Sequence, residues 1–108
     1  MKYYKDDGKD RVREKEITLE TALMEIERFP SIKQFDGNFI GFTKSKEDTI
    51  QFIREEKDNW LIDVPVFENG KFSYSLNDSE LTTEKVKEIV KRFFSGGKWQ
   101  SLCNLTQQ

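Results

Sequence analysis

Between Asn38 and Leu76, apolar residues recur at every second position in four consecutive runs. Because side chains alternate between the two faces of a strand, each run predicts a strand with one apolar and one polar face. We therefore predict an antiparallel meander in this part of the chain. The four apolar runs are Ile40 and Phe42; Ile50 and Phe52; Trp60, Ile62, Val64 and Val66; and Phe72, Tyr74 and Leu76.

The turn around Gly70 decides whether the last two apolar faces coincide. A two-residue turn at positions 69–70 would oppose Val66 to Ser73 and point the two faces apart. A three-residue loop at positions 68–70, with Gly70 in the left-handed conformation, would pair Val66 with Phe72 and keep the faces together. We therefore predict the three-residue loop.

Both tryptophans are candidates for a core or a binding role. A three-residue loop at positions 56–58 would pair Arg54 with Trp60, and Trp60 belongs to the inward-facing run. We predict that Trp60 is a core anchor, with Arg54 over its ring as a cation–π pair. Trp99 directly follows the Gly96-Gly97 pair. It either locks the preceding helix to the sheet or lies at a partner surface.

Two segments show the periodicity of amphipathic helices. The first begins after Thr18, a suitable N-cap, and ends before Pro30. The second begins after Thr82 and ends at Gly96 or Gly97, either of which can adopt the left-handed C-cap. Their apolar stripes are Leu19, Ala22, Leu23, Ile26 and Phe29 in the first helix, and Val86, Ile89, Val90 and Phe93 in the second.

These elements predict an α+β fold: a two-layer sandwich in which two helices cover one face of an antiparallel sheet of four to six strands. Residues 1–108 are predicted to form a single domain. The charged segment 1–16 is predicted to be a frayed tail or an edge strand, with a turn at positions 6–10. Alternation between Trp99 and Leu105 indicates a last short strand at a sheet edge.

Charged residues make up 35% of the chain, but the net charge is only −2. This balance argues against a general nucleic-acid binder and suits a basic protein partner. The first residues lack the apolar core of a signal peptide, and the chain has no apolar run long enough to span a membrane. The single cysteine, Cys103, cannot form an internal disulfide. We therefore expect a cytoplasmic protein.

The sequence contains no histidine. This absence removes Ser-His-Asp and Cys-His mechanisms, histidine metal ligands and the usual near-neutral general base. The glycine-containing segment 95–98 follows a helix, so we interpret it as a C-cap rather than a phosphate loop. Cys103 has no basic neighbour in sequence and is expected to be a quiet thiol. We therefore predict no catalytic residue, no metal site and no cofactor, and we expect a protein that is not an enzyme.

The polar face of the meander carries carboxylates among apolar residues. Glu55 and Asp63 lie on the predicted outward face, together with Ile53, Leu61 and Phe39. This arrangement is either an ordinary solvated sheet face or a protein-recognition patch, in which apolar side chains are set among charged ones.

The segment from Leu81 to Lys98 combines a capped helix, two phenylalanines, two glycines and a basic residue. It resembles the closing helix of the first-numbered immunity-protein family of polymorphic toxin systems. An opening helix followed by a run of strands resembles the earlier part of that family. The resemblance implies a non-enzymatic protein that binds a cognate toxin domain, blocks its active site and meets basic groups with carboxylates. The candidate partner-binding residues are Glu55, Glu56, Asp58, Asp63 and Trp99.

Two other functions are compatible with the sequence. One is a small-ligand-binding or enzymatic domain that uses Tyr74, Arg54 and Asp63 in a cavity between sheet and helices. The other is a structural or adaptor module, and the sequence leaves its state as a monomer or a dimer open. The neighbouring gene discriminates these alternatives. A large secreted protein with a variable C-terminal domain favours immunity, whereas a metabolic operon favours ligand binding.

Overall fold

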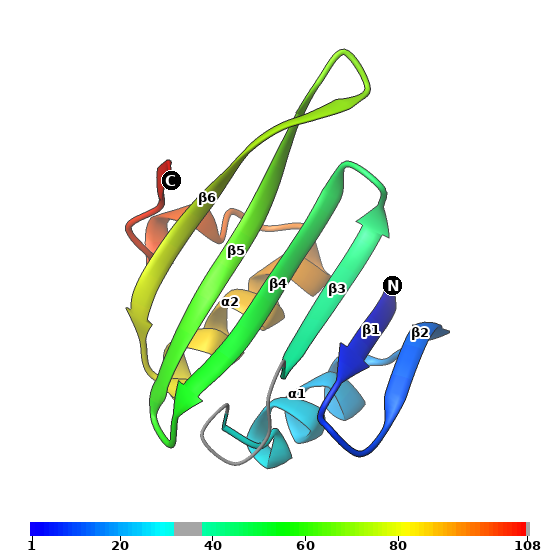
Figure 1. Ribbon diagram of the computed structural model, residues 1–108, viewed down its shortest axis with the longest axis vertical. Helices are drawn as coiled ribbons and strands as arrows, with labels where there is room; N and C mark the ends of the chain where they lie inside the picture. Colours follow the sequence, from blue (N-terminus) through cyan, green and yellow to red (C-terminus); the bar gives the residue numbers. More distant parts are fainter. Residues whose placement is uncertain (32–37, 108) are drawn as a thin grey trace.

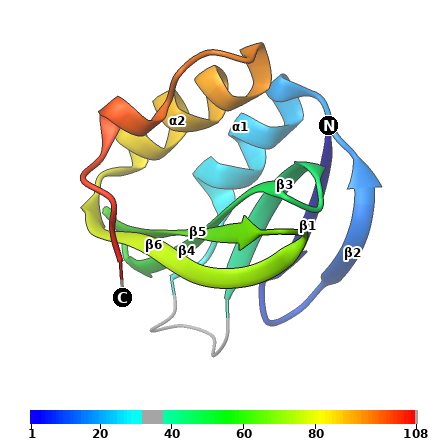
Figure 2. The ribbon, with the colours of Figure 1, turned by 90° about the horizontal axis from the view of Figure 1, so that it is seen from above.

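The computed structural model describes residues 1–31 and 38–107. Within these residues a seven-stranded antiparallel sheet forms one layer and two helices form the other (Figures 1 and 2). This confirms the predicted α+β sandwich with both helices on one face. The strands are β1 (Lys2–Asp6), β2 (Arg11–Glu16), β3 (Phe39–Ser45), β4 (Asp48–Glu56), β5 (Asn59–Glu68), β6 (Lys71–Leu81) and β7 (Thr106–Gln107). The helices are α1 (Leu19–Arg28) and α2 (Thr83–Ser95), and a 3₁₀ turn, η1, spans Gln100–Leu102.

The N-terminal segment is a β-hairpin rather than a frayed tail. Asp7 Oδ1 accepts the N–H groups of Lys9 and Asp10 in the predicted turn between β1 and β2. Strand β1 also pairs with β3, with Tyr4 opposite Gly41, so β1 lies inside the sheet and β2 forms its edge. The described sheet thus exceeds the predicted four to six strands, because the charges of this segment belong to paired strands.

Both helices start where they were predicted to start. Thr18 Oγ1 accepts the N–H of Thr21 before α1, and Thr82 Oγ1 accepts the N–H of Lys85 before α2. Helix α2 ends at Ser95, and the φ of 81° at Gly96 confirms the left-handed C-cap. Neither of these helices is long and apolar enough to cross a membrane.

The core fills the space between the two layers. Trp60 is fully buried, and its ring packs against those of Phe29 and Phe52. Arg54 pairs with Trp60 across β4 and β5 and lies 5.1 Å from its ring centroid, as predicted. The other fully buried apolar residues are Ala22, Ile26, Ile40, Phe42, Ile50, Phe52, Ile62, Val86, Ile89 and Val90.

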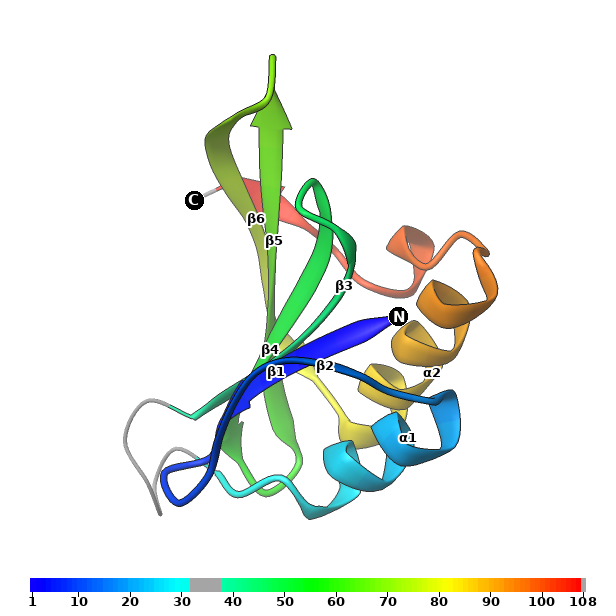
Figure 3. The same ribbon diagram turned by 90° about the vertical axis from the view of Figure 1, so that its right-hand side faces the viewer.

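Strands β5 and β6 continue beyond the helices as a two-stranded arm, residues 64–76 (Figures 1 and 3). The predicted three-residue loop is wrong: Glu68 pairs with Lys71, so the turn contains two residues. A β-bulge then shifts the register and pairs Val66 with Tyr74. The bulge, rather than the loop, keeps the two apolar runs on one face. Phe72 pairs with Phe67 instead and is 60% exposed.

Two smaller features of the chain path also differ from expectation. Glu56 pairs with Asn59, so the turn between β4 and β5 contains two residues and the predicted three-residue loop is wrong. A register shift between Arg54 and Glu56 nevertheless allows the predicted pairing of Arg54 with Trp60. The last short strand lies at the sheet edge, as predicted, but begins only at Thr106, after η1.

Replacing Gly70 by valine should lower the free energy of unfolding by roughly 1–2 kcal/mol. Gly70 has a φ of 77° in the hairpin turn, and a β-branched side chain resists this conformation. Chemical denaturation would measure the loss. Gly97→Ala is the matched control, because a Cβ there meets neighbouring atoms no closer than 3.5 Å. Equal midpoints for Gly70→Val and wild type would contradict the turn conformation.

Candidate protein-binding face

The face of the sheet opposite the two described helices, which we call the open face, is the candidate site (Figure 3). Its side chains alternate in sequence with the core residues of the same strands. Most are half-buried, so neighbouring side chains hold them while leaving part of each exposed. The central residues of the open face are Tyr4, Phe39, Gln51, Ile53, Leu61, Asp63 and Asn77.

A row of polar side chains crosses the middle of the open face. The Tyr4 hydroxyl donates to Gln51 Oε1 at 2.9 Å. Gln51 lies opposite Asp63 in the pairing of β4 with β5, and Asn77 Nδ2 donates to Asp63 Oδ1 at 2.6 Å. We call Tyr4, Gln51, Asp63 and Asn77 the polar row. It joins side chains from β1, β4, β5 and β6, so it fixes their orientation across the sheet.

Gly41 makes room for the Tyr4 ring. A Cβ at Gly41 would lie 2.1 Å from Tyr4 Cζ, which shows that the ring covers this glycine directly. Burial raises the pKa of Tyr4 to about 12, and the nearby charge of Asp63 adds to the effect. The hydroxyl is therefore protonated near neutral pH and acts there as a hydrogen-bond donor rather than as a base.

Apolar side chains border the polar row on the side of the β4–β5 turn. Ile53 lies opposite Leu61, and the ring of Phe39 is 6.0 Å from that of Tyr4, centroid to centroid. The open face therefore combines a fixed hydrogen-bonded row with accessible apolar and aromatic surface. Such a combination is typical of surfaces that recognise another protein.

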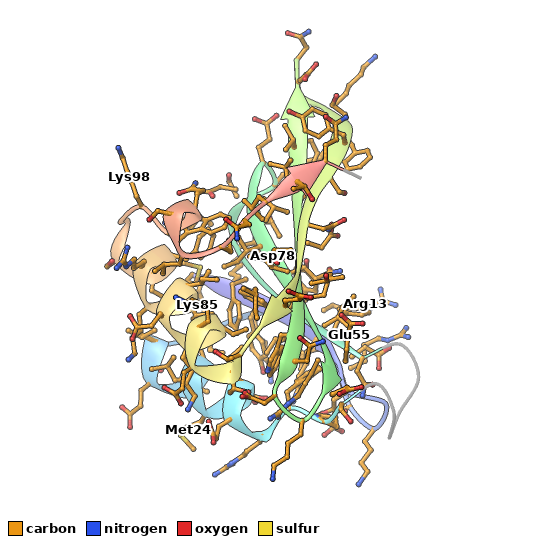
Figure 4. The ribbon with its side chains drawn as sticks, turned by 90° about the vertical axis from the view of Figure 1, so that its left-hand side faces the viewer. Arg13, Met24, Glu55, Asp78, Lys85 and Lys98 are labelled. Atoms are coloured by element: carbon orange, nitrogen blue, oxygen red, sulfur yellow. The ribbon has the colours of Figure 1, made fainter. Side chains whose placement is uncertain are left out.

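The structure brings only part of the predicted partner-binding set onto this face. Glu55 points away from the helices, whereas Met24 and Lys85 lie on the helical side (Figure 4). Asp63 is in the polar row. Glu56 is exposed at the β4–β5 turn.

Two of the predicted partner-binding residues, Asp58 and Trp99, make contacts within the fold. Asp58 is exposed, but its Oδ1 accepts the N–H of Thr83 at 2.8 Å, at the start of α2. Trp99 is only 7% exposed, and its ring packs edge-on against Phe93 of α2. The structure thus shows Trp99 packed against α2, and its role at a partner surface stays a prediction. A charge reversal at Asp58 would disturb the fold as well as the surface.

The bond to Thr83 makes Asp58 sensitive to acid. Hydrogen bonds from the backbone and side chain of Thr83 hold the pKa of Asp58 below its usual value. A lowered pKa in the folded state stabilises the protein above the unfolded-state pKa, and this contribution disappears as the pH falls through the folded-state pKa.

Asp58→Asn should therefore be less stable than wild type at neutral pH, and the difference should shrink as the pH falls below about 4. Thermal unfolding of both proteins across this range would measure the difference. A difference independent of pH would show that the carboxylate charge contributes nothing to the bond with Thr83.

Sequence reasoning did not identify Tyr4, Gly41 or Asn77 as parts of a site. The first two depend on the pairing of β1 with β3, which brings together residues far apart in the chain. The sequence allowed an edge strand in segment 1–16, but its charge-rich composition did not indicate that β1 pairs with β3. The Tyr3-Tyr4 pair is a sequence signal that could have revealed it, because aromatic residues favour strands.

The alternative ligand site proposed from sequence is not assembled. Arg54 donates to the carbonyl oxygens of Phe29 and Lys57, Tyr74 lies in the arm opposite Val66, and Asp63 is on the open face. The described residues also contain no cluster of three Asp, Glu or Cys side chains placed to hold a metal ion. Cys103 is half-buried, and burial, together with the charge of Asp78, raises the pKa of its thiol to about 11.

No family model matches the chain, and comparisons with curated proteins and with solved structures found no match either.

Proposed function

We propose that this protein is an immunity-type inhibitor: it binds a cognate toxin domain through the open face and blocks the toxin's active site without catalysing a reaction. It would act in the cytoplasm of the cell it protects. The observation that carries the proposal is the open face itself, where apolar side chains border an ordered polar row on one side. The resemblance of segment 81–98 to the immunity family supports the same function.

Order on the open face favours binding. The hydrogen bonds of Tyr4 and Asn77 already hold the side chains of Gln51 and Asp63 in the free protein. A partner therefore does not have to immobilise these groups when it binds, which reduces the entropy lost on association. Apolar contacts at Ile53 and Leu61 would supply most of the affinity, because desolvated central side chains dominate interfaces.

Carboxylates on the open face suit a basic partner. Glu55 and Asp63 carry negative charge on the side away from the helices. Toxin domains that cleave nucleic acids need basic clefts to hold the phosphate backbone. Complementary charge would speed the encounter with such a cleft and make the association rate depend on salt.

The test uses the C-terminal domain of the protein encoded by the neighbouring gene, which the proposal predicts to be the toxin. In cells that express both proteins, wild type should restore growth, and the double variant Ile53→Ala with Leu61→Ala should not. In vitro the double variant should bind at least about 30-fold more weakly, equivalent to about 2 kcal/mol. Met24→Ala is the matched control, because Met24 is 44% exposed on the helical layer.

Circular dichroism would establish that each variant is folded before binding is compared. A folded double variant that protects as well as wild type would contradict the open face as the interface. A wild-type protein that neither binds the toxin domain nor protects the cell would contradict the function.

A further inference from the structure

Among the described residues, the arm leaves two strand edges unpaired, one along β5 and one along β6. The pairing of β4 with β5 ends where Gln51 lies opposite Asp63, but β5 continues to Glu68. Beyond Asp63, β6 is the strand that pairs with β5 in the described part of the chain. Figure 1 shows β5 running past the start of β4. An unpaired strand edge offers backbone hydrogen-bonding groups to an added strand.

The register shows which groups face this edge. Pro65 pairs with Ser75 of β6, yet proline has no N–H to exchange in a hydrogen-bonded pair. The backbone of Pro65 must therefore point away from β6. Alternation along the strand puts the N–H and C=O of Phe67 on the same side. The free edge thus offers both backbone groups of Phe67.

A cleft of about 300 Å³ lies beside this edge. Residues 64–67 of β5 form one wall, and Glu47 of the β3–β4 turn forms the other together with Asp48 and Thr49 at the start of β4. Trp99 and Gln100 also line it. The cleft can therefore accommodate a side chain of an added strand against the apolar surface of Val66 and Trp99.

The charges of this cleft favour a basic occupant. The charged residues that line it, Glu47 and Asp48, are both acidic and exposed. Lys44 at the end of β3 and Lys46 on the β3–β4 turn line a different depression beside β1 and β2. Pairing of this edge with that of a second copy would bring four carboxylates together and place two prolines at one seam, so a second copy is a poor occupant.

We infer that the free edge of β5 accepts an extended basic segment of the partner as an added strand, with its cations near Glu47 and Asp48. This inference rests on the proposed function for the identity of the natural partner. Binding of a suitable peptide does not depend on that function. The edge of β2 is less suited, because its exposed side chains are charged. The edge of β6 in the arm is also less suited, because the acidic cleft is lined by β5 and not by β6.

The experiment uses a synthetic heptapeptide of alternating lysine and valine, added to the whole isotope-labelled protein. The peptide should shift the amide resonance of Phe67 and slow its hydrogen exchange, because that N–H gains an acceptor. The same peptide with all backbone amides N-methylated should give no protection. A peptide with glutamate in place of lysine should bind at least tenfold more weakly.

Protein variants test the acidic wall. Glu47→Lys with Asp48→Lys should reduce the affinity for the lysine peptide at least tenfold. The double variant Glu20→Lys with Glu80→Lys makes the same change in charge outside the cleft. It should change the affinity for the lysine peptide by no more than about twofold, since distant exposed charges are screened by salt.

Protection of the Phe67 amide by the lysine peptide, and its loss when the peptide is N-methylated, would support the inference. This holds even if the toxin domain does not bind, because that result would contradict only the proposed function. Absence of any shift at Phe67 at millimolar peptide would overturn the inference, including when toxin protection is intact. Equal weakening by the two double variants would also overturn it.

Discussion

Trp60→Ala is expected to lower the free energy of unfolding by about 3–5 kcal/mol, the range for deleting a large buried aromatic side chain. Trp60 is fully buried, and its ring contacts Phe29, which follows α1, and Phe52 of β4. Its Nε1 donates to Thr83 Oγ1 at 2.9 Å. Alanine would leave a cavity between the sheet and both helices and remove the donor to Thr83.

Urea denaturation would measure this loss, and Trp60→Phe separates its two parts. Phenylalanine keeps most of the apolar volume but lacks the N–H, so we expect a loss of about 1–2 kcal/mol from the missing hydrogen bond and the smaller ring. A loss below about 1 kcal/mol for Trp60→Ala would be incompatible with a buried anchor.

Arg54→Ala should lower the free energy of unfolding by about 2–3 kcal/mol, because several charge-assisted hydrogen bonds are lost together. The guanidinium donates to the carbonyl oxygen of Phe29 at 2.6 Å and, through Nε, to that of Lys57 at 2.9 Å. It also lies over the ring of Trp60. Arg54 therefore joins the end of α1, the β4–β5 turn and the core anchor.

Lysine is not expected to restore this stability, because one ammonium group cannot bond both carbonyls and stack on the ring. Arg28→Ala, at the exposed end of α1, is the matched control and should change stability by less than about 0.5 kcal/mol. Equal effects of Arg54→Ala and Arg28→Ala in thermal unfolding would contradict the role of Arg54 in joining α1, the β4–β5 turn and Trp60.

Local patterns were sufficient for the helices and the central strands. The caps at Thr18, Thr82 and Gly96 depend on short-range geometry, and the alternating runs around Phe52 and Trp60 reflect burial against one layer. Both signals are contained in neighbouring residues. This is why the two-layer fold could be predicted from the sequence.

One error concerns a local turn, and another concerns a contact between residues far apart in the chain. The Asn69-Gly70 turn is closed by two residues because both adopt positive φ values, 53° and 77°, and the bulge beyond it then corrects the register. The role of Asp58 depends on the start of α2, which lies 25 residues away in sequence. The residues next to Asp58 in sequence indicate only an exposed charge.

Gly41 also determines how the N-terminal hairpin docks on the rest of the sheet. The Tyr4 ring occupies space that only a residue without a side chain leaves free. A two-residue slip of β1 along β3 would keep every side chain on its proper face but move this ring onto Phe39 or Thr43, beside Gly41 in the strand. The fit of the Tyr4 ring over Gly41 thus sterically excludes slipped registers that the hydrophobic pattern alone would tolerate.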